Sequence, residues 1–324
     1  MRPAHRRTLA TTKPNSERAN DQASALTNFP FCNNNSLMIR KILMILALPV
    51  FLSSCSKKAT QGKTTITASF YPLFVMLENI CDGADAHISM LAPSDTGCLH
   101  DYQLTTKDMQ AISKSDIIVV NGLGMEDFID KVLEKKKDST IVAGEGFLTV
   151  DDNPHIWVSI AGAIYEVRNI ADRLCELDAK NAEIYSKNAE SYIEKLQNLQ
   201  EEMHESLDKA AGSKIITFHE AFPYFAAEFN LDIASVIERE PGTAPSPKEL
   251  NDTVAVIKEA NEKTGRTIPL FAEPQYSGAS AKIIASETGS EIYELDPAVT
   301  GNGGKDSYIE AMRKNMMTLK EALQ

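Results

Sequence analysis

A long helical segment between two halves of alternating strands and helices constrains the fold of this chain more than any other feature. Apolar residues recur at spacings of three and four along residues 178–211, from Ala182 through Tyr185 to Met203, and no glycine or proline interrupts them. This spacing predicts one amphipathic helix. At 1.5 Å per residue the helix would be about 50 Å long, enough to run along both halves. We therefore expect a stiff linking helix and small movements between the halves.

On either side of this helix, strand-like runs alternate with helical segments. The Ser-Pro-Lys-Glu sequence at residues 246–249 is a capping box with proline at the first helical position, which predicts a helix start. Alternating strands and helices favour parallel sheets covered by helices. We predict an α/β fold with two lobes, residues 64–177 and 212–324, each with a central, mostly parallel sheet flanked by helices and joined by one long rigid helix. Strands are expected at residues 64–69, 87–91, 116–120, 140–143, 214–218, 232–237, 268–272 and 291–295.

Residues 38–54 have the pattern of a secretory signal peptide. Two basic residues precede an apolar run, residues 42–52, and small residues follow it. The run is too short to span a bilayer, which needs about 20 apolar residues. We expect Met38 to be the true start and residues 1–37 to be a non-native upstream extension.

The signal peptide ends in Leu-Ser-Ser-Cys, which resembles a bacterial lipobox and implies lipid attachment at Cys55. An ordinary signal peptide followed by a chance cysteine is the alternative. Residues 55–63 are polar and are expected to form a flexible tether. The protein should then be an extracytoplasmic lipoprotein, in the periplasm or on the cell surface, that is anchored to a membrane without spanning it.

The charge of the chain argues against nucleic-acid partners. Without residues 1–54 it has 26 basic and 43 acidic residues, a net charge of −17. Such an acidic surface repels DNA and RNA, so we expect no nucleic-acid partner. We expect the protein to be a monomer.

Three cysteines remain after the presumed lipid site: Cys81, Cys98 and Cys175. Outside the cytoplasm a disulfide is allowed, and Cys81–Cys98 is one pairing. A buried thiol is the second alternative. Because Cys98 lies two residues before His100, a thiolate metal ligand is the third.

Three widely spaced histidines each follow a strand or the loop at its end: His100, His155 and His219. His219 directly follows the strand at residues 214–218, and Asp296 directly follows the one at residues 291–295. Ligands bind beyond the carboxyl ends of the strands in parallel sheets, so the four side chains should meet between the lobes. Three imidazoles and a carboxylate can fill a tetrahedral site for Zn²⁺ or Mn²⁺.

Each candidate ligand also has a simpler reading. A histidine beside aromatic residues is often only a hydrogen-bonded core residue, and Asp296 could simply end its strand. Glu273 is a rival carboxylate. His87, within a strand, and His204, on the long helix, are expected to be structural. The set of four therefore carries the metal hypothesis, and no single member does.

Over nearly all of residues 64–324 the chain resembles the substrate-binding lipoproteins of zinc and manganese ABC transporters, the metal-binding cluster A-I family, in its zinc-uptake form. The resemblance is carried by His-Asp-Tyr at 100–102, Asn-Gly at 121–122, Pro-His-Ile-Trp at 154–157, Phe-His-Glu-Ala-Phe-Pro-Tyr-Phe at 218–225, Ser-Pro at 246–247, Phe-Ala-Glu at 271–273 and Leu-Asp-Pro at 295–297.

This resemblance implies a receptor that captures a metal ion between its lobes and delivers it to an ABC permease. It implies His100, His155 and His219 as ligands, with Asp296 where many members supply the fourth. Manganese-selective members often have glutamate where this chain has His219, so the resemblance favours Zn²⁺ over the alternative, Mn²⁺. The long His- and acid-rich loop of several zinc-uptake members has no match between Gly122 and His155.

We do not expect an enzyme. The chain has no His-Glu-x-x-His motif, and four protein ligands would close the site, whereas a catalytic zinc keeps an open position. Two alternatives from other classes are a zinc hydrolase with Glu220 as its base and a surface adhesin whose metal only stabilises the fold.

Overall fold

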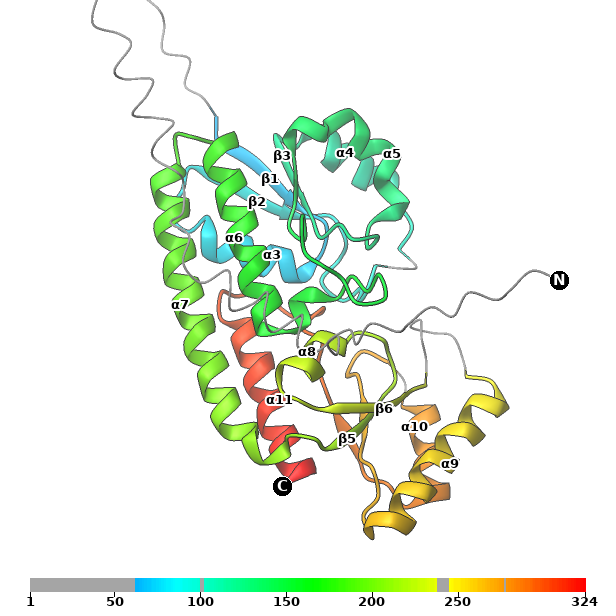
Figure 1. Cartoon of the computed structure of the whole chain (residues 1–324). Helices are drawn as coiled ribbons and strands as arrows, with labels where there is room; N and C mark the ends of the chain where they lie inside the picture. The colour runs from blue at the N-terminus through cyan, green and yellow to red at the C-terminus, as the bar shows by residue number, and fades with distance from the viewer. Residues whose placement is uncertain (1–61, 100–101, 238–244, 277) are drawn as a thin grey trace, which may run out of the picture.

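The protein has two lobes, each built on a four-stranded parallel sheet (Figure 1). The computed structural model describes residues 62–99, 102–237, 245–276 and 278–324. The N-terminal sheet contains β1 (Thr64–Ala68), β2 (Ala86–Met90), β3 (Ile117–Val120) and β4 (Thr140–Val142). The C-terminal sheet contains β5 (Lys214–Thr217), β6 (Asp232–Val236), β7 (Leu270–Ala272) and β8 (Ile292–Glu294). The predicted fold class is confirmed, and each expected strand is present.

The two sheets share one topology. Their strand orders are β2-β1-β3-β4 and β6-β5-β7-β8, so in each lobe the second strand lies on one side of the first and the third strand on the other. The strand order reverses between β1 and β3 and again between β5 and β7. Such reversals leave a crevice beyond the carboxyl ends of the two central strands, where ligands of α/β proteins bind.

The N-terminal sheet is flanked by α3 (Tyr71–Ile80), α4 (Thr106–Lys114), the short α5 (Asp130–Leu133) and α6 (Ile160–Leu177). A capping box starts α4, because Thr105 Oγ1 accepts from the Asp108 backbone N–H at 3.3 Å and Asp108 Oδ2 accepts from the Thr105 N–H at 2.7 Å. Aspartate thus serves where glutamate or glutamine is usual. After β3, the short helix α5 lies between two 3-10 segments, Asp127–Ile129 and Glu134–Ser139.

The long helix α7 spans Ala182–Leu207 and runs beside both lobes (Figure 1). It begins later than residue 178 because Asp178 accepts hydrogen bonds at 2.8 Å from both Asn181 Nδ2 and the Tyr185 hydroxyl, which fixes a turn after α6. Its 26 residues make a rod of about 39 Å. The helix packs against α3 and α6 and, from the other lobe, α11 (Ser307–Leu323).

The C-terminal sheet is flanked by α8 (Pro223–Glu228), α9 (Pro247–Thr264) and α10 (Ala279–Thr288). The predicted capping box at Ser246 starts α9, with both of its hydrogen bonds present. One hydrophobic cluster runs through both lobes and includes Leu73 of the first and Phe222 of the second. The lobes therefore share a continuous core. No helix within the described part of the chain is long and apolar enough to cross a membrane.

Candidate metal centre

His155 is held in one orientation by its neighbour Asn153. It precedes the 3-10 segment Ile156–Val158 that leads into α6. The Asn153 amide nitrogen donates to the Glu220 carbonyl at 2.7 Å, so its oxygen faces His155. That oxygen accepts from the His155 backbone N–H and from Nδ1, each at 3.0 Å. The proton is thereby placed on Nδ1, and Nε2 keeps the lone pair that a metal needs.

A carboxylate, that of Glu273, orients the His219 ring in a similar way. It lies two residues beyond the end of β5, and Glu273 lies one residue beyond the end of β7, the neighbouring strand at the point of reversal. His219 Nδ1 donates to Glu273 Oε1 at 2.9 Å, and both side chains are 1% exposed. Gln275 Nε2 donates to the other Glu273 oxygen at 2.5 Å. A histidine whose Nδ1–H is bonded to a carboxylate offers Nε2 as a well-oriented and more basic ligand.

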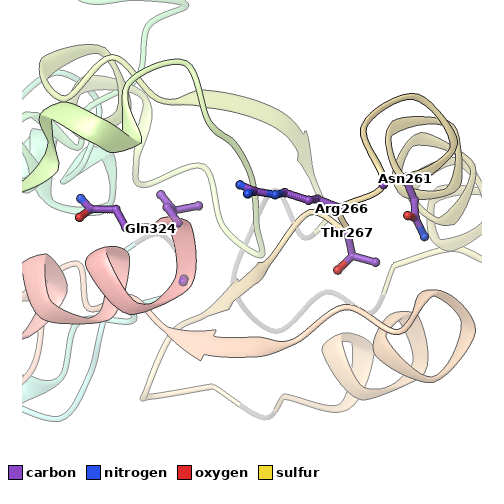
Figure 2. A pocket seen from close by; sticks show the side chains of 7 residues that line it. Asn261, Arg266, Thr267 and Gln324 are labelled. Carbon is purple, nitrogen blue, oxygen red and sulfur yellow. The ribbon is translucent and has the colours of Figure 1, made fainter.

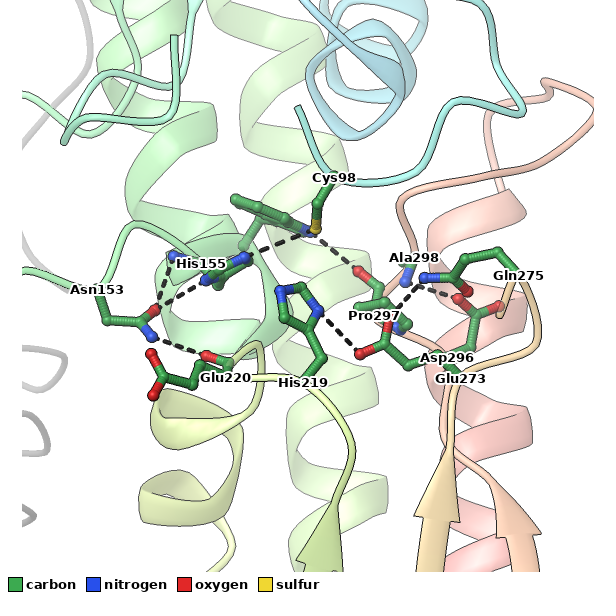
Figure 3. Close-up of polar contacts among 11 residues, drawn as sticks. Cys98, Asn153, His155, His219, Glu220, Glu273, Gln275, Asp296, Pro297 and Ala298 are labelled. Atoms are coloured by element: carbon green, nitrogen blue, oxygen red, sulfur yellow. Dashed lines mark hydrogen bonds and ion pairs between the residues drawn. The ribbon is translucent and has the colours of Figure 1, made fainter. Parts of the chain in front are cut away.

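Cys98, His155 and His219 meet between the lobes (Figure 3). Their donor atoms all lie within 4.8 Å of one another, and all three residues are buried. The Cys98 sulfur is 3.6 Å from His155 Nε2, and the two imidazole rings are nearly perpendicular with centroids 4.8 Å apart. Within the described ranges this is the one group of three or more histidine, cysteine and acidic side chains close enough to share a metal ion.

The remaining expected site residues either lie outside the described residues or do not join the close group. His100 and the lipidation residue Cys55 lie outside the described residues. Asp296 follows β8 as expected, but it is not part of the close group. Its Oδ1 accepts from the Ala298 N–H at 2.8 Å, and its charge acts on Glu273. Glu273, the rival carboxylate, contacts His219 instead.

The two histidines expected to be structural lie elsewhere. His87 is exposed on β2, and the His204 ring lies 4.9 Å from the Phe229 ring. Burial lowers the pKa of His204. Neither belongs to the close group.

The structure contains no Cys81–Cys98 disulfide, although it describes both residues. Cys81 ends α3 and lies near Asp178 and Tyr185, at the turn between α6 and α7. Cys98 lies beside His155 instead. Burial, with a smaller contribution from Asp178, raises the pKa of the Cys81 thiol to about 12. The structure therefore contradicts the disulfide alternative, because the fold gives the two sulfurs different surroundings.

Contacts from the opposite lobe hold the loops around the group. The buried indole of Trp157 donates to the Pro297 carbonyl, just after β8, at 2.9 Å. Tyr276, after β7, is hydrogen-bonded through its hydroxyl to the Cys98 backbone. Gly97 allows this approach, since a Cβ there would come within 3.1 Å of the Tyr276 oxygen and its φ is +81°. The histidines and the cysteine are thus positioned by both lobes.

The surroundings of the group favour a cation. Burial raises the pKa of Glu273, and its hydrogen bond with His219 partly offsets that effect. Burial also raises the pKa of Asp296, offset by the Ala298 N–H and by Lys314. Asp296 raises the pKa of Glu273 further. A metal ion bound by the group of Cys98, His155 and His219 would offset the negative charge of these two carboxylates in a poorly solvated place.

A pocket lies between the ends of α9 and α11 in the C-terminal lobe (Figure 2). No histidine, cysteine or acidic side chain lines it, and Arg266 is its one charged side chain. It offers no donor set for a metal cation. Its lining residues are Asn261, Gly265, Arg266, Thr267, Ala322, Leu323 and Gln324.

Sequence reasoning missed two contributors to the site. Asn153 is not among the residues singled out from the sequence, and Glu273 is there only a rival ligand, whereas both fix an imidazole. A signal for Glu273 existed, since it directly follows a strand next to the one before His219. The orientation of Asn153 depends on the Glu220 carbonyl of the other lobe, and no local pattern reveals it.

Comparisons with known proteins identify the family of this chain. Residues 66–322 match the family described as "Zinc-uptake complex component A periplasmic" (ZnuA). The chain is 28% identical to the zinc-binding lipoprotein AdcA of Streptococcus pneumoniae, over 87% of this chain, and spans only 61% of the length of that relative. The Zn(II)-bound crystal structure of that protein matches with a TM-score of 0.68 and 28% identity, over 81% of this chain and 58% of the other.

Two further solved structures match over 81% of this chain. The Pseudomonas aeruginosa substrate-binding protein FpvC, in complex with Ni²⁺, has a TM-score of 0.72 and 29% identity over 97% of its chain. The laminin-binding protein Lmb of Streptococcus agalactiae has a TM-score of 0.71 and 28% identity over its whole chain, and is described as a bifunctional protein with adhesin and metal transporting activity. Since the family match covers most of its length, this chain belongs to the family of zinc-uptake complex component A periplasmic proteins.

Proposed function

We propose that this protein captures Zn²⁺ between its two lobes, outside the cytoplasmic membrane, and delivers it to an ABC permease. One observation carries the proposal. His155 and His219 come from different lobes, and each has Nδ1 hydrogen-bonded to an oxygen, which orients Nε2 of each as a metal ligand. Proteins orient metal-binding imidazoles in this way. The family match and the zinc-bound structure of AdcA support zinc as the cargo.

The remaining metal ligands, the membrane anchor and the permease partner are proposed from the family resemblance. His100 is proposed as the third imidazole ligand, and Asp296 is the carboxylate expected as the fourth. Lipid attachment at Cys55 would hold the receptor at the membrane. The receptor would act as a monomer. In this setting the permease is the partner that removes the metal, and docking to it would disturb the contacts between the lobes.

Ligand variants test the location of the site. His155→Ala and His219→Ala should each abolish tight, equimolar Zn²⁺ binding in competition with a chelator, because each removes a buried donor. His87→Ala is the matched control, since His87 is an exposed histidine of the same lobe as His155. If both site variants bind zinc as tightly as the unmodified protein, the site is misplaced.

The choice of metal needs its own experiment. Imidazole suits Zn²⁺, whereas carboxylate ligands suit Mn²⁺. Competition between the two metals should favour Zn²⁺ in the unmodified protein, and His219→Glu should shift the preference toward Mn²⁺. Preference of the unmodified protein for Mn²⁺ would transfer the proposal to manganese uptake.

A receptor also differs from a zinc hydrolase in what its metal does. A receptor keeps its metal fully ligated and turns over no substrate, whereas a hydrolase needs a metal-bound water. The zinc-loaded protein should therefore leave ester and peptide substrates intact. Turnover that depends on Glu220 would instead favour the hydrolase.

The likeness to Lmb supports adhesion as a second candidate function, because that protein is described as both adhesin and metal transporter. A deletion strain separates the two roles. Poor growth under zinc limitation is expected from the transport role. Normal growth combined with lost attachment would favour adhesion.

A further inference from the structure

Cys98 shares the buried group with the two histidines, although the expected ligand set does not include it. It lies in the loop after β2 and is 7% exposed, while His155 is 2% and His219 is 1% exposed. The sulfur is 3.6 Å from His155 Nε2, on the side of the ring opposite the Asn153 contact. Figure 3 shows it above both rings, between the lobes.

The spacing fits a shared metal ion. In a tetrahedral zinc site the Zn–S bond is about 2.3 Å and the Zn–N bond about 2.1 Å, which separates sulfur from nitrogen by about 3.6 Å. The observed separation of Cys98 Sγ and His155 Nε2 is 3.6 Å. A simple thiol–imidazole contact would also allow this distance, but it would not require His219. The donor atom of His219 nevertheless lies within 4.8 Å of both others.

The opposite lobe supports the Cys98 loop directly. The Tyr276 hydroxyl is hydrogen-bonded to the Cys98 backbone, and it lies close to Gly97. The centroid of the Tyr276 ring is 6.5 Å from that of the His219 ring. The sulfur is therefore held in place by the same lobe that supplies His219. A donor that is positioned before the metal arrives loses little conformational freedom on binding.

We infer that the Cys98 thiolate is a ligand of the transported metal ion, together with His155 and His219. This inference rests on the proposed function. On binding, a sulfur–metal bond forms, the S–H bond breaks, the proton leaves to solvent and no electron is transferred. Asp296 is oriented by the Ala298 N–H and lies outside the close group.

A thiolate ligand narrows the class of cargo. Thiolate is a soft donor that selects zinc and other thiophilic ions, whereas Mn²⁺ prefers oxygen ligands. Cys98 would therefore make this receptor discriminate against manganese more strongly than imidazoles and a carboxylate alone. Its loss should weaken zinc binding at least as much as the loss of an outer-shell partner, roughly 10- to 100-fold.

X-ray absorption at the zinc edge tests the inference on the unmodified protein, loaded with one equivalent of Zn²⁺ under a non-chelating reductant. One sulfur neighbour at about 2.3 Å is expected. A shell of nitrogen and oxygen neighbours alone would overturn the inference while leaving the proposed function intact. Failure to bind zinc at all would overturn both.

Cobalt substitution identifies which sulfur binds. The Co²⁺-loaded protein should show a thiolate-to-cobalt charge-transfer band in the near ultraviolet, and Cys98→Ser should lose that band. Cys81→Ser is the matched control and should retain it. Retention of the band by Cys98→Ser, or loss in Cys81→Ser, would contradict the assignment. In Zn²⁺/Mn²⁺ competition, Cys98→Ser should also show a smaller preference for zinc.

Discussion

His219 Nδ1 and Glu273 Oε1 are 2.9 Å apart and almost completely buried, and they join the ends of two neighbouring strands of one sheet. The carboxylate orients the ring and makes Nε2 more basic, which strengthens its bond to a metal. The nearly identical bond between His155 and Asn153, in the other lobe, uses a neutral amide. The two lobes thus present the same kind of ligand with different basicity.

Glu273→Gln should weaken zinc binding by roughly 10- to 100-fold, the usual effect of losing an outer-shell partner. The amide can still accept from His219 Nδ1, so the fold should be preserved while ligand basicity falls. Chelator competition measures the change. Glu259→Gln, on the exposed face of α9, is the control and should bind as the unmodified protein does. Equal affinities of the two variants would exclude a metal-tuning role for Glu273.

Trp157 should report metal binding by fluorescence. It is the single tryptophan of the chain, and its ring centroid lies 5.3 Å from that of His155. A cation bound by His155 changes the field at the indole, so its emission should change until one equivalent of zinc has been added. His155→Ala should abolish the saturable change. A spectrum that does not respond to zinc, in protein shown to bind it, would contradict the predicted location of the site.

Much of the architecture could be predicted from sequence because buried strands are short apolar runs and the capping boxes are local. The helix α6 was missed because part of its start is fixed from a distance. Glu228 Oε2 accepts from the backbone N–H of Ile160 at 2.8 Å, and the two residues are 68 positions apart. The linking helix was predicted too long because Asp178 is bound to side chains that follow it.

The site shows the same division between local and distant signals. A histidine or aspartate after a strand is visible in the sequence, and this pattern led to His219 and Asp296. The pairing of Cys98 with His155 depends on loops 57 residues apart that the fold brings together. From the sequence alone, thiolate ligation is therefore only one of three alternatives for Cys98.

Gly162→Ala should destabilise the turn that carries His155. A Cβ at Gly162 would lie 1.9 Å from the Ile156 carbonyl oxygen, so the backbone must move. We expect the free energy of unfolding to fall by about 1–3 kcal/mol, as in other overpacked sites, and zinc affinity to fall as well. Gly278→Ala is the control, because a Cβ there meets nothing within 4 Å. Equal denaturation midpoints for the two variants would show that this turn tolerates the methyl group.

Glu228 should make stability depend on pH in the acidic range. Burial raises its pKa to about 7, although Gln200 and the start of α6 donate to it. In the unfolded chain the pKa would be near 4.5, so the folded state binds more protons between these values. The contribution of Glu228 is therefore fully present below pH 4.5 and is lost as the pH rises through about 7, by a few kcal/mol in order of magnitude.

The difference between the unmodified protein and Glu228→Gln isolates this effect from the other carboxylates. The unmodified protein should lose more unfolding free energy than the variant as the pH rises across that window, because glutamine does not titrate. Glu259→Gln serves again as the exposed control and should follow the unmodified protein closely. Urea denaturation at a series of pH values gives the curves. Parallel curves for the unmodified protein and Glu228→Gln would mean that Glu228 ionises in the folded state as readily as in the unfolded chain.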